Sequence, residues 1–135
     1  KTRKRFLNLM SQEFKTEIIS PDKSIFSGKT EEVVLPCFEG QVTILKDHIS
    51  FITFLRPGFI EIGKDEKFFV EDGTIEFANN NLLVLSATII NLKNIKADQI
   101  GRMIKEAEQK SSSNQVSDKQ QYILNYKIET LKQIN

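Results

Sequence analysis

The spacing of apolar and polar residues changes near residue 96. Between residues 14 and 92, Val, Ile and Phe occur in short runs that are interrupted by Gly, Pro, Asn and Asp. Short β-branched and aromatic runs separated by turn residues are typical of antiparallel strands. We therefore predict a β-sandwich or flattened barrel that covers residues 13–95.

Three turn signals divide this β-rich part. In KFFVEDGTIEF, Asp72-Gly73 predicts a type I′ hairpin that pairs the two flanking apolar runs, since both residues tolerate a positive φ. Pro57-Gly58 predicts a tight turn in which Gly58 takes the positive-φ position. The three asparagines at residues 79–81 predict a further turn before the apolar run LLVLSATII.

After residue 96 the apolar residues follow a helical period. Residues 117–120, SDKQ, fit a capping box in which Ser117 and Gln120 exchange hydrogen bonds at a helix start. We predict two amphipathic helices joined by the SSSN loop, which form an antiparallel hairpin over residues 96–135. Their apolar stripes contain Ile100, Met103, Ile104 and Ala107 in the first helix, and Leu124, Ile128 and Leu131 in the second.

Charge is unevenly distributed along the 135 residues, although the net charge is only +1. Residues 1–12 carry four basic side chains and no acidic ones, whereas residues 13–95 carry eight basic and 13 acidic ones. An acidic body argues against a nucleic-acid partner, because nucleic-acid-binding domains usually present a basic surface. We expect residues 1–12 to be a disordered extension outside the fold.

Membrane insertion and a disulfide framework are not expected. No apolar run approaches the roughly 20 residues that a membrane-spanning helix needs. The chain has one cysteine, which excludes an internal disulfide and suits a reducing compartment.

Catalytic chemistry is poorly represented in the sequence. There is no phosphate-binding loop and no dinucleotide fingerprint, and one His and one Cys are too few for a common zinc site. Cys37 and His48 could form a thiol–imidazole dyad of a small hydrolase, or they could be a buried apolar thiol and a loop residue. We favour the second interpretation, and predict no catalytic residue, cofactor or metal.

Several segments, in order along the chain, resemble the epsilon subunit of bacterial rotary ATP synthases, which corresponds to the mitochondrial delta subunit. They are FKTEIISPDKSIFSGKTEEVVLP, EGQVTILKDH, LRPGFIEI, FFVEDGTIEFANNNLLVLSATI and ADQIGRMIKEAEQK. The resemblance covers roughly residues 13–135. It implies a sandwich of about ten strands followed by a helical hairpin, in agreement with the periodicity.

The resemblance also implies a function. Such subunits are non-catalytic rotor parts of the central stalk that bind gamma and the membrane c-ring, couple proton flow to ATP synthesis, and often restrain ATP hydrolysis through the helices. It implies a peripheral location on the cytoplasmic face of the bacterial inner membrane, or on the mitochondrial inner membrane as the alternative. The competing hypothesis is a free-standing β-sandwich binding module whose helices mediate dimerisation.

Two groups of contact residues are carried over from the family. Residues that would face the c-ring are Glu39, Gly40, Gln41, Lys46, Asp47 and His48. The chain departs from the family here, because Lys46-Asp47 replaces a usual Pro-Gly and Thr43 replaces a usual Gly; His48 could instead hydrogen-bond within its own loop. Residues that would face gamma or the alpha/beta catalytic head are Ile100, Met103, Ile104, Leu124, Ile128 and Leu131.

Some family members bind ATP through an Ile/Leu-Asp-x-x-Arg-Ala motif on the helices. Aligned on Ile95, this motif places Lys96 at the acidic position and Gln99 at the arginine position. Triphosphate recognition relies on cationic groups held in fixed geometry. We therefore predict that the chain binds ATP weakly or not at all.

Overall fold

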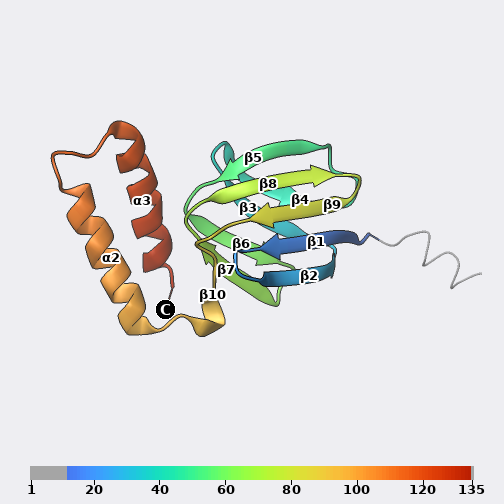
Figure 1. Cartoon of the computed structure of the whole chain (residues 1–135), viewed down its shortest axis with the longest axis horizontal. Coiled ribbons are helices and arrows are strands. Elements are labelled where there is room, and N and C mark those ends of the chain that lie inside the picture. Colours follow the sequence, from blue (N-terminus) through green and yellow to red (C-terminus); the bar gives the residue numbers. More distant parts are fainter. Residues whose placement is uncertain (1–11, 135) are drawn as a thin grey trace, which may run out of the picture.

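The computed structural model describes residues 12–134, so the predicted disorder of residues 1–12 lies outside the described residues except for Gln12. The described chain forms ten strands, one short 3-10 turn and two helices (Figure 1). In chain order they are β1 (Phe14–Ile19), β2 (Ser24–Thr30), β3 (Val33–Cys37), β4 (Gly40–Ile44), β5 (Phe51–Leu55), β6 (Gly58–Ile62), β7 (Glu66–Val70), β8 (Gly73–Ala78), β9 (Asn81–Leu85), β10 (Ile90–Asn91), η1 (Leu92–Asn94), α2 (Ala97–Ser111) and α3 (Asp118–Lys132).

The strands form one continuous sheet that curls into two layers. Its order is β10-β7-β6-β3-β5-β8-β9-β1-β2, and β4 pairs with β3 outside this path. Each pairing is antiparallel except that between β1 and β9. Strand β3 joins the layers, because Val33 and Val34 pair with β6 while Cys37 pairs with β5. The predicted β-sandwich followed by a helical hairpin is confirmed.

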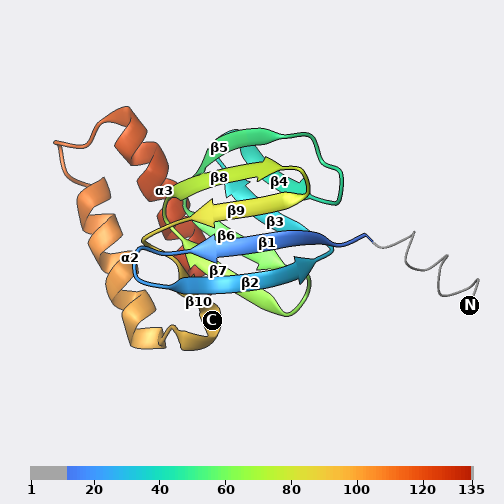
Figure 2. The same cartoon turned by 45° about the vertical axis from the view of Figure 1, so that its right-hand side comes forward.

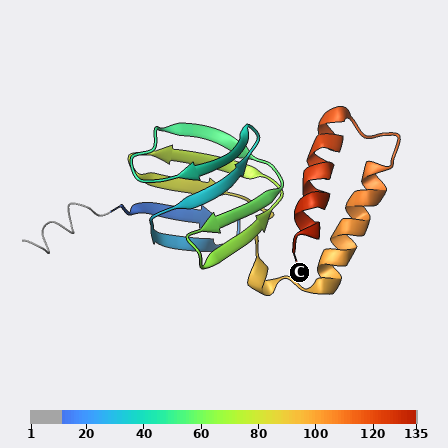
Figure 3. The same ribbon diagram turned by 180° about the vertical axis from the view of Figure 1, so that it is seen from behind.

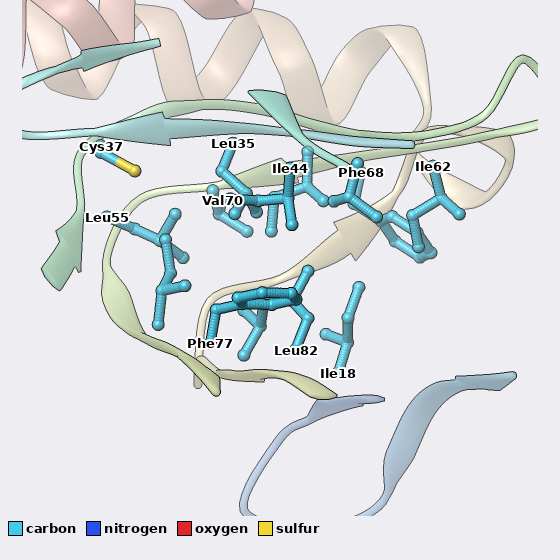
Figure 4. Packing of buried hydrophobic residues seen from close by; sticks show 14 of the residues in the cluster. Ile18, Leu35, Cys37, Ile44, Leu55, Ile62, Phe68, Val70, Phe77 and Leu82 are labelled. Atoms are coloured by element: carbon cyan, nitrogen blue, oxygen red, sulfur yellow. The ribbon is translucent and has the colours of Figure 1, made fainter. Parts of the chain in front are cut away.

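The core lies between the two layers (Figure 4). Alternate residues of the strands point into it, as expected for sheets packed face to face. The rings of Phe14 and Phe77 meet edge to face, with their centroids 5.7 Å apart. The buried hydroxyl groups of Thr16 and Thr30 form a hydrogen bond with each other, with 2.7 Å between the two oxygens. The principal buried residues are Phe14, Ile18, Val33, Leu35, Cys37, Ile44, Leu55, Ile60, Phe68, Val70, Ile75, Phe77, Leu82 and Val84.

The predicted hairpin at Asp72-Gly73 is wrong. Strand β7 pairs with β6 and β10, whereas β8 pairs with β5 and β9, so the chain crosses between layers at this point. The backbone N–H groups of Glu71 and Asp72 donate to Thr88 Oγ1 at 3.0 and 3.3 Å. Gly73 lies so close to β9 that a Cβ would come within 2.4 Å of the Leu85 carbonyl oxygen. The crossing therefore requires glycine for two reasons, namely the close approach of the β9 backbone and the φ of 150° at this position.

A two-residue turn of the I′ kind occurs instead at Asn79-Asn80. Both residues have left-handed backbones, with φ values of 51° and 58°, and Ala78 pairs with Asn81 across the turn. Asparagine is the residue other than glycine that best tolerates this conformation. The turn predicted from the asparagines is confirmed, and it joins β8 to β9.

The predicted turn at Pro57-Gly58 is also corrected. Gly58 begins β6 and is not among the residues with positive φ. A Cβ at Gly58 would come within 2.5 Å of Pro36 Cβ, so the requirement here is space and not backbone conformation.

Helices α2 and α3 form the predicted antiparallel hairpin, and α3 lies between α2 and the sandwich (Figure 3). The capping box of Ser117 and Gln120 is present at the start of α3. A second apolar cluster joins the hairpin to the sandwich. Its buried members are Phe69 of β7, Ile100 of α2 and Leu131 of α3. Neither helix in residues 12–134 is long and apolar enough to cross a bilayer.

We expect Gly73→Ala to destabilise the protein by about 3 kcal/mol, because the new methyl group would overlap a backbone oxygen at a φ that alanine disfavours. Gly101→Ala is the matched control, since a Cβ at this position in α2 meets nothing within 4 Å. Replacing a glycine inside a helix should stabilise the protein by up to about 1 kcal/mol. Urea unfolding followed by circular dichroism measures both changes, and equal effects of the two substitutions would contradict the crossing described above.

Candidate interaction surfaces

The six residues predicted to face a c-ring fall into two groups at opposite ends of β4. Glu39 lies in the two-residue turn between β3 and β4, and Gly40 and Gln41 are the first residues of β4. Residues 46–48 lie in the loop that follows Ile44, at the other end of the same strand. Strand geometry of about 3.4 Å per residue separates the two ends by roughly 14 Å. The structure therefore does not bring the six residues together.

We call the sandwich end nearer the helices the hairpin end, and the opposite end the distal end (Figure 2). The hairpin end contains the turns at residues 20–23, 38–40, 56–57, 71–72 and 86–87, several of which line a groove with Ile123 of α3. The distal end contains residues 30–32, 45–50, 63–65 and 79–80. In the view of Figure 2, β5, β8, β9, β1 and β2 lie side by side on one face between these ends.

At the hairpin end, Glu39 is held by its own sheet. Its carboxylate accepts a hydrogen bond from Thr53 Oγ1, with oxygen–oxygen distances of 2.7 and 2.9 Å. The backbone N–H of Phe38 donates to the Phe54 carbonyl at 3.1 Å. The turn that carries Glu39 is therefore attached to β5 and has a fixed position.

At the distal end, Asp47 has a left-handed backbone with a φ of 66°. Its N–H donates to Asn80 Oδ1 at 2.7 Å, and its carboxylate accepts from Asn80 Nδ2 at 2.9 Å. The neighbouring His48 N–H donates to the Leu45 carbonyl at 3.1 Å. The loop between β4 and β5 is thus fastened to the turn between β8 and β9.

His48 packs into its own loop. Its ring centroid lies 5.2 Å from that of Phe51 and 5.9 Å from that of Phe77. Nδ1 lies 2.8 Å from the Ile49 carbonyl oxygen, and because a carbonyl oxygen can only accept, Nδ1 is the donor of this hydrogen bond. This geometry agrees with the interpretation of His48 as a residue that hydrogen-bonds within its loop.

The thiol–imidazole dyad does not form. Cys37 lies in the core at the hairpin end of β3, while His48 lies at the distal end. Burial, with a smaller effect of Glu39, raises the pKa of the Cys37 thiol to about 11, and Arg56 opposes this weakly. A thiol with this pKa is protonated at neutral pH and is a poor nucleophile. Residues 12–134 also contain no cluster of metal ligands.

Sequence reasoning missed an apolar strip on the outer face of β5 and β9. It consists of Ile52, Phe54, Leu83 and Leu85, and Ile52 and Phe54 are 74% and 58% exposed. In the register of the sheet, Phe54 and Leu85 flank Thr74 of β8, and Ile52 and Leu83 flank Glu76, so the strip consists of two apolar pairs on either side of the polar outer face of β8. It leads into the groove at the hairpin end, which is about 680 Å³ in volume. The run FITFL, apolar at outward as well as inward positions, was the available signal.

The distal end also exposes apolar side chains. Leu45 and Ile49, on either side of Asp47, are 51% and 78% exposed. Several charged residues lie near Leu45 around an open hollow, namely Glu13, Lys29, Glu31, Glu32, Lys46, Lys64, Asp65 and Glu66. An apolar pair beside a mixed charged rim has the composition of a docking surface.

Four of the six helix residues predicted to contact gamma or the catalytic head pack inside the protein. Ile100 and Leu131 are buried against Phe69, with Met103 and Ile104 packed beside them. Leu124 and Ile128 are half-buried on α3. The four residues that belong to the second cluster dock the hairpin on the sandwich, so they can contact a partner fully only after the hairpin moves away. Leu124 and Ile128 lie outside this cluster.

Polar contacts add to this docking and were not predicted. The Arg56 guanidinium lies 4.1 Å from the ring centroid of Tyr126, and Nη1 donates to Tyr122 Oη at 3.5 Å. This hydrogen bond from Arg56 is the main influence that lowers the pKa of Tyr122. Lys127 Nζ pairs with a Glu71 oxygen at 2.8 Å. The four-residue spacing of the two tyrosines, outside the aliphatic stripe, was the sequence signal for a second helical face.

The residues aligned with the ATP-binding motif do not converge on a site. Lys96 is exposed at the start of α2, and Ile100 is buried in the second cluster. Gln99 is half-buried. Weak or absent ATP binding remains a prediction.

Comparison with known proteins places these features in context. The family model described as ATP synthase, Delta/Epsilon chain, beta-sandwich domain matches residues 13–92. An ATP synthase epsilon chain of Pelagibacter ubique is 46% identical over 130 residues, which cover 93% of this chain and 100% of that protein. An epsilon chain of Parvibaculum lavamentivorans is 30% identical, over 93% of this chain and 97% of its own length.

Solved structures share the fold at low sequence identity. A chain in the Euglena gracilis mitochondrial ATP synthase superposes with a TM-score of 0.72 at 16% identity, covering 89% of this chain and 79% of that one. A chain of the Tetrahymena thermophila central stalk and c-ring gives 0.62 at 14% identity, over 87% and 92%. Since the family match covers the sandwich and the sequence relatives extend through the helices, this chain belongs to the ATP synthase delta/epsilon chain family.

Proposed function

We propose that this chain is the epsilon-type subunit of a rotary ATP synthase. In this function it is a non-catalytic part of the central stalk that links gamma to the c-ring and couples proton flow to ATP synthesis. Its relatives match along almost their whole length, which favours this function over a free-standing module that dimerises through its helices. The geometric observation that carries the proposal is the exposed apolar strip of Ile52, Phe54, Leu83 and Leu85.

We assign the apolar strip to gamma. Large exposed apolar patches on soluble domains mark interaction sites, and a sheet face with aromatic and aliphatic side chains suits a long-lived subunit contact. Glu76 lies between Ile52 and Leu83 in the register, and Glu17 lies on the other side of Leu83, so one carboxylate lies within the strip and another at its border. The groove at the hairpin end extends this surface to α3, which allows gamma to touch both units of the chain.

We assign the distal end to the c-ring. The helices can reach the catalytic head only from the hairpin end, and in a central stalk the head and the ring lie in opposite directions. The distal end, with Leu45, Ile49 and residues 46–48, would then face the ring. Glu39, Gly40 and Gln41 lie at the other end of β4 and would contribute to a different contact.

The hairpin would act as a movable restraint on ATP hydrolysis. The same apolar stripe would pack against the sandwich or contact the alpha/beta head. The hairpin therefore cannot be docked on the sandwich and bound to the head at the same time. The sandwich-bound arrangement relies on one small apolar cluster and on the contacts of Arg56 and Lys127. Contacts of this size permit two arrangements of similar free energy.

The proposed location is peripheral, on the cytoplasmic face of a bacterial inner membrane. The sequence relatives reported above are bacterial, which favours this site over the mitochondrial inner membrane.

Ile52→Lys should weaken binding to the matching gamma subunit at least about tenfold, since it replaces a large exposed apolar side chain of the proposed interface by a charged one. Ile52 is exposed and faces Glu76 across the sheet, so the new lysine leaves the fold intact. Ser27→Glu, at an exposed position on β2, is the control and should bind like the wild type. Titration calorimetry measures both affinities; equal affinity of Ile52→Lys and wild type would contradict the assignment of the strip.

Ile49→Asp should weaken association with the purified c-ring about tenfold while leaving gamma binding unchanged, because Ile49 is exposed at the distal end. Gln41→Lys, exposed on β4 near the hairpin end, is the matched comparison. Co-sedimentation with detergent-solubilised c-ring at low and high salt distinguishes the two ends. A loss with Gln41→Lys and none with Ile49→Asp would reverse the orientation.

Arg56→Ala should release the hairpin from the sandwich and lower ATP hydrolysis by the assembled enzyme roughly two- to fivefold, since a cation–π contact and a hydrogen bond are lost. Removal of residues 96–135 should act in the opposite direction and raise hydrolysis while proton pumping persists. Arg102→Ala, whose Asp98 contact lies within α2, is the control. The effects are measured as ATP hydrolysis and proton pumping by membranes that carry each variant. Unchanged hydrolysis in Arg56→Ala and in the truncated variant would mean that the hairpin has a structural function and does not inhibit hydrolysis.

A further inference from the structure

The loop between β4 and β5 is joined to the turn between β8 and β9 by the side chain of Asn80, which lies 33 residues after Asp47. The Asn80 amide accepts from the Asp47 backbone N–H at 2.7 Å and donates to the Asp47 carboxylate at 2.9 Å. A primary amide has one acceptor and two donors, so it matches a backbone N–H and a carboxylate on one residue. We call this pair the Asp47–Asn80 clamp.

The clamp stabilises an unfavourable backbone conformation at Asp47. Asp47 has a φ of 66°, and residues other than glycine adopt this left-handed conformation infrequently. The hydrogen bond to its N–H fixes the orientation of the peptide that precedes Asp47, and the bond to its carboxylate fixes the side chain. Asn80 is itself secured, because it lies in a tight turn and its carbonyl accepts from the Lys15 N–H at 3.0 Å.

Two large apolar side chains near the clamp are exposed to solvent. Leu45 and Ile49 lie two positions before and after Asp47, and the His48 N–H closes the loop onto the Leu45 carbonyl. The conformation of Asp47 therefore determines how the two apolar side chains are spaced and directed. A surface ordered before it binds avoids the entropy loss of being ordered on association.

We propose that Asn80 is a positioning residue for ring docking, which acts through Asp47 to hold Leu45 and Ile49 in their binding arrangement. The partner is the c-ring of the proposed function, on which this inference rests. Asn80 need not touch the ring; it sets the shape of the loop that does.

The first test needs no partner. Asn80→Gly removes the amide but retains the turn, since Asn-Gly is the preferred pair for a type I′ turn. The Asp47 amide should then exchange with deuterium at least about tenfold faster, because it loses its acceptor. Asn79→Gly alters the same turn without touching Asp47 and should leave this exchange unchanged. An unchanged rate in Asn80→Gly would overturn the clamp.

The second test is a rescue in the assembled rotor. Asn80→Gly should weaken association with purified c-ring at least about fivefold, the lower end of the range for a lost pair of hydrogen bonds. Adding Asp47→Gly should restore the affinity to that of Asp47→Gly alone, since glycine adopts the left-handed conformation unaided. Failure of this rescue, or normal affinity of Asn80→Gly, would overturn the positioning function.

The two tests separate this inference from the function on which it rests. If Ile49→Asp leaves ring association intact, the distal end does not face the ring and the proposed orientation fails. Amide exchange at Asp47 still reports on the clamp in that case. If Ile49→Asp weakens association and the rescue fails, the orientation stands and the positioning function of Asn80 is wrong.

Discussion

Strand β7 is buried on both faces, and this burial attaches the helical hairpin to the sandwich. Phe68 and Val70 point into the sandwich, while Phe69 between them points outward to Ile100 and Leu131 of the hairpin. One strand thus belongs to both apolar clusters. A strand alternates its side chains between two faces, so a continuous apolar run can hold a sandwich and a helical layer at once.

This sharing explains which surfaces remain for partners. The inner strand faces and the helical stripe are used for internal packing, so contacts of the folded chain must come from other positions. The apolar strip on β5 and β9 and the exposed pair Leu45 and Ile49 meet that need, on a side face and at the distal end. Separate surfaces would let a small stalk subunit bind two partners at the same time.

Polar side chains decide how the connections between strands are placed. Thr88 holds the crossing after β7, Thr53 holds Glu39, and Asn80 holds Asp47. Each contact joins residues at least 14 positions apart. The contacts of Thr88 and Asn80 supply acceptors for backbone N–H groups at points where the regular sheet pairing ends, and that of Thr53 joins two side chains. The loops of this sandwich are therefore fixed in position by contacts between distant parts of the chain.

Local sequence patterns were enough to predict the two-part architecture, the start of α3 and the turn at Asn79-Asn80. Each depends on interactions within a few residues, such as strand alternation, the capping box of Ser117 and Gln120, or asparagine backbone preference. Which strands pair, and which site residues lie together, could be learned only from the tertiary structure. Phe68 and Phe77 have the same alternation whether their strands pair in one sheet or face each other across a core, so the pattern could not exclude a hairpin at Asp72-Gly73. Closeness in sequence was equally uninformative for Glu39 and His48, because the intervening strand carries them to opposite ends of the sandwich.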